Sequence, residues 1–112
     1  MRNVKEMREP TWLVLTALAG AGRLHGYGIT GEVERLSEGR LRLRAGTLYA
    51  ALDRLAGEGL VATAGEEVVD GRLRRYYALT TEGRRALEAE ARARARISAV
   101  ALGRLGLAGA PQ

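Results

Sequence analysis

The chain has 112 residues, which is room for one domain with a single modest core. Hydrophobic residues make up 46% and charged residues 28%, a balance that is typical of a globular protein and excludes a disordered chain. With no cysteine and one histidine, the sequence lacks the means for disulfides, zinc sites or hydrolytic triads, so we expect no catalytic residues, no metal and no cofactor, while the net charge of +5 favours a polyanionic partner.

The first element is an apolar run that begins at Trp12 and predicts a helix from Pro10 to about Gly20. This run is too short to span a bilayer, so no membrane partner is expected. It also lacks the flanks of a secretory signal, which indicates a cytoplasmic location.

Two further helices follow. Residues 23–26 form a linker to the second, in which Ile29, Val33 and Leu36 recur at helical spacing. Residues 41–43 alternate over too few positions to predict more than a one-bridge strand. The third helix runs from about Ala45 to Gly57 and carries one apolar stripe, formed by Leu48, Ala51, Leu52 and Leu55.

The remaining residues predict an antiparallel hairpin and a long helix. The strands of the hairpin are expected at residues 60–64 and 74–79, joined by a polar turn over residues 65–73. A long helix then runs from about Thr81 to Arg104, capped by Thr80. Two helices separated by a tight turn and followed by a hairpin predict a mainly α fold with a small β-hairpin, a winged helix-turn-helix. We expect residues 1–80 to bind DNA and residues 81–112 to form a dimerisation helix and tail.

The third helix has the properties of a helix that reads the major groove, which must bury one face and present small or hydrogen-bonding side chains on the other. Its exposed side carries Gly46, Thr47, Ala50, Asp53 and Arg54, with Tyr49 at the border. Arginines bracket this face from the preceding turn and from the hairpin, as expected for neutralising a DNA backbone. We therefore predict the DNA-binding residues to be Arg42, Arg44, Thr47, Tyr49, Arg54, Arg72, Arg74 and Arg75. The alternative is an ordinary amphipathic helix beside a solvated polar turn, and Asp53 favours that alternative.

These residues also carry a family resemblance. The segments are residues 24–29, 46–49, 51–52, 54–55, 58–61, 71–72, 75–80 and 82–83. In their order and spacing they resemble the PadR family of transcriptional regulators. The resemblance implies a dimeric winged-helix repressor that binds a pseudo-palindromic operator and can release it on binding a small molecule. It also implies that Thr47 and Tyr49 face DNA and that residues 72–75 form the wing. Arg44-Ala45 stands where the family usually has Ser-Pro, and Leu73 stands where a proline often stiffens the wing, which implies a mobile wing.

The last helix is too long to be covered by so small a domain, and its exposed apolar seam predicts a two-fold dimer interface. The predicted interface residues are Trp12, Ala93, Ile97, Val100, Ala101 and Leu105. An alanine-rich helix that packs only on its own domain is the alternative.

Two functions remain open on these residues. The first is a DNA-binding repressor with an effector pocket at its dimer interface. The second is a winged-helix module that docks on another protein without meeting DNA. We do not expect an enzyme, because the sequence offers no nucleophile–base pair and no cluster of metal ligands.

Overall fold

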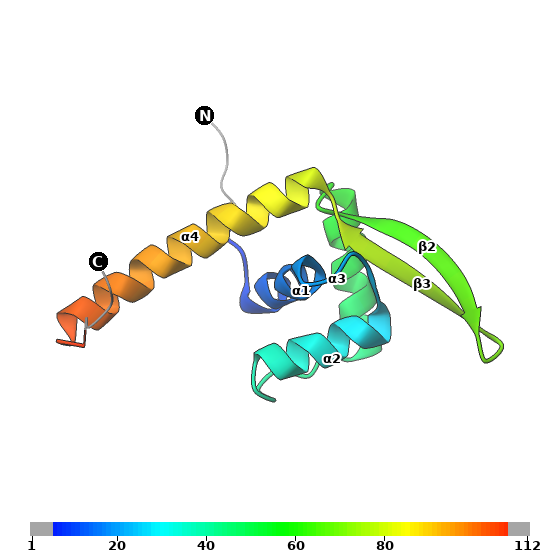
Figure 1. Ribbon diagram of the computed structural model, residues 1–112, viewed down its shortest axis with the longest axis horizontal. Coiled ribbons are helices and arrows are strands. Elements are labelled where there is room, and N and C mark those ends of the chain that lie inside the picture. Colours follow the sequence, from blue (N-terminus) through cyan, green and yellow to red (C-terminus); the bar gives the residue numbers. More distant parts are fainter. Residues whose placement is uncertain (1–5, 108–112) are drawn as a thin grey trace.

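The computed structural model describes residues 6–107, so the two ends of the predicted domains, residues 1–5 and 108–112, lie outside the described residues. The elements in order are α1 (Glu9–Ala19), β1 (Leu24–His25), α2 (Gly26–Leu36), α3 (Ala45–Gly57), β2 (Val61–Val69), β3 (Arg72–Leu79) and α4 (Thr81–Arg104). They form a winged helix-turn-helix with one long C-terminal helix (Figure 1). The predicted fold class is confirmed.

The core is built around α1, which lies between α4 on one side and α2 and α3 on the other (Figure 1). Val14, Leu15 and Leu18 of this helix are fully buried. They belong to one cluster with the inward stripes of α2 and α3 and with Tyr77 of β3. Each such aliphatic side chain stabilises the fold by about 1.5–3 kcal/mol relative to exposure. This cluster fixes how the helix-turn-helix and the hairpin lie relative to each other.

The short strand lies elsewhere than predicted. Residues 41–43, between α2 and α3, are irregular instead and follow a turn at residues 37–40, where the backbone N–H of Leu41 donates to the buried Ser37 Oγ at 2.9 Å. The strand is β1, directly before α2, where Leu24 pairs with Tyr77 and His25 with Tyr76 of β3. A strand of two residues exists only through this long-range pairing, so the local sequence carries no signal for it.

The hairpin is longer than predicted, because most of residues 65–73 belong to its strands. The turn itself is Asp70-Gly71, with φ of 53° and 76°. Two positive φ angles define the type I′ turn, for which Asp-Gly is a preferred sequence. Val69 pairs with Arg72 next to this turn, so the ladder continues to the tip of the wing.

The long helix α4 begins at the predicted cap and extends beyond the rest of the domain. The Thr80 hydroxyl accepts from the Gly83 N–H at 2.9 Å and donates to the Gly59 carbonyl at 2.6 Å. The C-terminal half of α4 projects away from the other elements (Figure 1). Of the helices in the described part, none has the length and apolar character needed to cross a membrane.

Candidate nucleic-acid interface

The N-terminal half of α3 presents a small, uncrowded face to solvent. Gly46, Thr47 and Ala50 are exposed, whereas Leu48 and Leu52 are buried beneath them. The helix begins after Arg44, whose side chain makes no capping hydrogen bond. Its first backbone N–H groups therefore have no side-chain cap and remain available to an anion such as a phosphate oxygen.

The arginines of the turn before α3 differ in whether they already have a partner within the chain. Arg42 pairs with Glu34 of α2 at 3.2 Å, although its side chain remains 75% exposed. Arg40 donates to the Ser37 carbonyl at 3.1 Å, which helps to close the turn. Arg44 is exposed and has no ion pair among the described residues. Of the predicted cations of this turn, Arg44 is thus the one free to approach a phosphate.

Tyr49 joins α3 to the elements on both sides of it. Its hydroxyl lies so close to Gly26 of α2 that a Cβ there would be 2.9 Å from the Tyr49 Cζ. Its ring lies 6.5 Å from that of Tyr77 on β3. Because 43% of Tyr49 stays exposed, it can pack the helix into place and still offer an edge to a ligand.

Arg54, predicted for the same face, lies near the other end of α3. Its guanidinium donates to the Thr11 hydroxyl of α1 at 2.9 Å and lies 3.8 Å from Glu58. The bond to Thr11 holds α3 against α1. The structure therefore places Arg54 apart from the arginines that flank the start of the helix.

The wing lies beside α3 and supplies the second group of arginines. Arg72 is exposed at the tip and has no ion pair among the described residues, and Arg74 is half-buried beside it. Arg75 pairs with Glu66 at 3.2 Å, and this carboxylate raises the pKa of the guanidinium. A groove of about 490 Å³ runs between the wing and the start of α2, with Tyr49 in its wall. The structure thus brings the wing arginines and the start of α3 to one side of the molecule.

A bulge at the base of the wing is held by one arginine that the sequence does not mark. The register shifts between Thr63 and Glu66, where β2 carries one extra residue. The Arg23 guanidinium donates to the Ala64 carbonyl at 2.9 Å, pairs with Glu67 at 3.3 Å and lies 4.0 Å from the Tyr76 ring centroid. Bulges bend a strand, so these contacts fix the direction in which the wing leaves the domain.

Tyr27 is the exposed residue of this surface that the sequence prediction omitted. It lies on the first turn of α2 and is 86% exposed, between the start of α3 and the wing. It precedes the buried Ile29 by two positions, an offset of about 200° on a helix. That offset is a signal from which its exposure could have been predicted.

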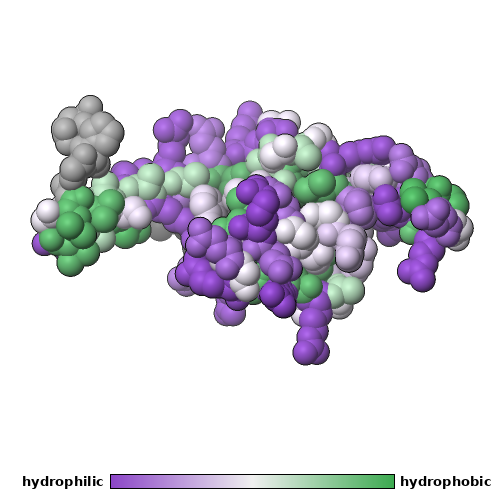
Figure 2. Space-filling view, turned by 60° about the horizontal axis from the view of Figure 1, so that its bottom comes forward, coloured by the Kyte–Doolittle hydropathy of each residue, from purple (hydrophilic) through white to green (hydrophobic). Residues whose placement is uncertain are grey.

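The predicted dimer residues on α4 are largely exposed. Ile97 is 70%, Val100 49% and Leu105 71% exposed, whereas Ala93 is half-buried. Figure 2 shows hydrophobic residues gathered at the end of α4, and a second group at the tip of the wing. Trp12 instead packs within its own chain, with the Arg94 guanidinium 4.6 Å from its ring centroid. Its predicted contact with a partner chain stays a prediction.

The chain is similar to known proteins along most of its length. The model of the transcriptional regulator PadR-like family matches residues 14–89. A transcriptional regulator of Mycobacterium tuberculosis, Rv3488, is 40% identical over 85 residues, which are 76% of this chain and 76% of that protein. An uncharacterised 37.1 kDa protein of transposon TN4556 from Streptomyces fradiae is 46% identical over 86 residues, 77% of this chain but only 23% of that protein.

Solved structures show the same fold. A PadR family transcription regulator from Clostridium difficile R20291 is 27% identical, with a TM-score of 0.68 over 84% of this chain and 94% of that one. Bacillus subtilis PadR, solved in complex with operator DNA, is 23% identical, with a TM-score of 0.63 over 72% of this chain and 46% of that one.

Proposed function

Since the chain belongs to the PadR-like family of transcriptional regulators, we propose that it binds double-stranded operator DNA as a homodimer and acts as a repressor. The start of α3 enters the major groove with Thr47 and Ala50 toward the bases. Arg44 and Arg72, from the turn and the wing, contact the flanking phosphates. The observation that carries this proposal is the exposed start of α3, flanked by Arg44 and Arg72, which form no ion pair within residues 6–107. The operator complex of Bacillus subtilis PadR supports the same use of the fold.

The dimer forms along the C-terminal half of α4. Ile97, Val100 and Leu105 expose large apolar side chains on a helix that projects from the domain. Pairing with a second α4 would remove these side chains from water, at about 25 cal/mol per Å² of apolar surface. A small-molecule effector that binds at the dimer interface and releases the operator is part of this proposal.

The oligomeric state tests the dimer. Ile97→Asp places a charge on the apolar side of α4, so sedimentation velocity should show monomers at micromolar concentration where the unmodified chain forms dimers. Ala99→Asp is the matched control, because two residues along a helix place it about 200° away, and it should remain dimeric. Both variants should keep the same helical content by circular dichroism. A monomeric unmodified chain would refute the dimer.

Operator selection tests the function. Genomic fragments retained by the purified dimer should share a palindrome with half-sites about one helical turn apart. Retention should weaken by orders of magnitude as salt rises, since it depends on phosphate contacts. A chain that retains no duplex at low salt would refute the repressor and favour a winged-helix module that docks on another protein.

A further inference from the structure

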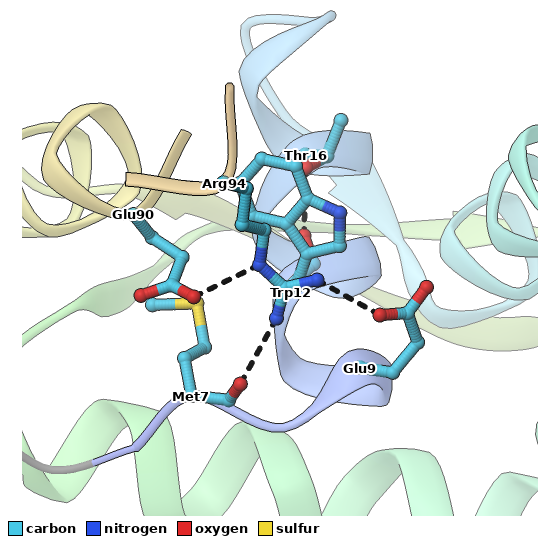
Figure 3. A network of polar contacts seen from close by, with 6 residues as sticks. All are labelled: Met7, Glu9, Trp12, Thr16, Glu90 and Arg94. Atoms are coloured by element: carbon cyan, nitrogen blue, oxygen red, sulfur yellow. Dashed lines mark hydrogen bonds and ion pairs between the residues drawn. The ribbon is translucent and has the colours of Figure 1, made fainter. Parts of the chain in front are cut away.

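One guanidinium joins the root of α4 to α1 (Figure 3). Arg94 donates to the Glu90 carboxylate at 2.8 Å, to Glu9 at 2.9 Å and to the Met7 carbonyl at 3.0 Å. The same guanidinium lies over the Trp12 ring. Three acceptors and an aromatic face thus hold the side chain, and they come from the start of α1, the segment before it and α4 itself.

The other ion pairs along α4 differ from this one. Arg92 pairs with Glu88 and Arg85 with Glu82, and both pairs lie within the helix. Such pairs stiffen a helix but do not attach it to another element. Among the ion pairs of the described residues, that of Arg94 with Glu9 joins α4 to α1. The Arg94 side chain is also only 32% exposed, against 71% for Arg92.

Arg94 is also where α4 leaves the domain. Ala91, Ala93 and Arg94 are half-buried, whereas each residue from Ala95 to Leu107 is exposed. The helix continues for ten residues to Arg104, about 15 Å at 1.5 Å per residue. The direction of this free arm is therefore set by the contacts at its root.

We propose that Arg94 is a positioning residue that fixes the angle between α4 and the winged domain, and thereby the spacing of the two recognition helices in the dimer. This inference rests on the proposed function, in which the free arms pair. Half-sites one turn apart place each α3 about 17 Å from the two-fold axis. A tilt of about 10° at the root of α4 moves any part of the domain about 17 Å from that pivot by roughly 3 Å, close to the rise of one base pair. Loss of the Arg94 contacts should therefore weaken the preference of the dimer for one half-site separation, while the phosphate contacts remain.

The spacing can be measured directly in the free dimer. The chain has no cysteine, so Ala50→Cys carries one spin label per recognition helix, and electron–electron dipolar spectroscopy gives the distance between the two labels. Arg94→Gln should broaden this distance distribution or shift it by about 3 Å or more. Arg92→Gln, which removes the same charge from the same helix, should leave it narrow. Arg94→Lys keeps the charge but loses the planar fork, so its distribution should be intermediate.

Operators with altered spacing provide the second measurement. The unlabelled dimer should bind best at one half-site separation and about tenfold or more weaker when one base pair is added or removed, and Arg94→Gln should reduce this ratio to about two- or threefold. A lower melting temperature alone, with the distance distribution and the spacing preference unchanged, would overturn the role of Arg94 and leave the repressor intact. If the labelled chain without the Arg94 substitution gives no measurable distance between two labels, it is not a dimer, and both proposals are overturned.

Discussion

Removal of a single wing arginine should change how operator binding depends on salt. Arg72 lies at the tip of the wing, is exposed and has no ion pair among the described residues. Its charge is therefore free to neutralise a phosphate and to release the cation condensed there. Arg72→Ala removes this contact without leaving a buried or unpaired carboxylate behind, so the effect on binding is not mixed with a loss of stability.

The size of the effect follows from counterion release. The logarithm of the binding constant falls with the logarithm of salt concentration with a slope of about −0.9 for each neutralised phosphate. A dimer loses two contacts, so the slope should become shallower by about 1.8. Between 50 and 200 mM salt, this difference corresponds to roughly tenfold in affinity. Arg72→Ala should thus bind much more weakly at low salt and approach the unmodified protein as salt rises.

Fluorescence anisotropy of a labelled operator, titrated at four or five salt concentrations, measures both slopes. Arg85→Ala is the control, since Arg85 is an exposed arginine that pairs with Glu82 within α4. It should lower the affinity little and leave the slope unchanged. If Arg72→Ala and Arg85→Ala have equal slopes, the tip of the wing does not contact phosphate and our placement of DNA is wrong.

Two further predictions concern the start of α4 and are checked by thermal unfolding. A Cβ at Gly83 would collide with the Leu60 carbonyl oxygen, so Gly83→Ala should destabilise the domain by roughly 1–3 kcal/mol. In contrast, Gly103→Ala on the same helix meets nothing within 4 Å and should stabilise by about 0.5–1 kcal/mol; equal effects of the two would contradict the close packing. Thr80→Ala removes the cap and the bond to Gly59 and should cost about 1 kcal/mol, and an unchanged midpoint would show that the cap contributes nothing.

The helices of this fold could be predicted from the sequence because each carries its own period and ends at its own breaker. The strands depend on distant partners: the hairpin was predicted correctly, but its strands are longer than predicted and the short strand lies elsewhere. Residues 41–43 alternate like a strand, but they form an irregular link between α2 and α3, in which the Leu41 N–H bonds to Ser37 instead of to a strand. In the hairpin, the polar residues from Gly65 onward suggested a loop, although Asp70-Gly71 was the stronger local signal.

The sequence predicted which residues of the candidate site are exposed, but not which distant residues they contact. The exposure of Thr47 follows from the periodicity of α3, and the structure agrees. The contact of Arg54 with Thr11 joins residues 43 positions apart, so no local pattern could indicate it. For the same reason Arg23 was overlooked, since its role depends on a bulge that exists only in the paired sheet.

The wing attracts DNA less strongly than its number of arginines suggests, because acidic residues on the same hairpin balance their charge. Its six charged residues are Glu66, Glu67, Asp70, Arg72, Arg74 and Arg75, which sum to zero. Glu66 is occupied by Arg75, and Glu67 by Arg23 at the bulge. The acidic residues therefore shape the base of the wing, while Arg72 at the tip and Arg74 beside it have no ion pair among the described residues. A neutral wing with its free cations at one end binds phosphate only where the tip meets it, so its contribution depends on the direction that Arg23 imposes.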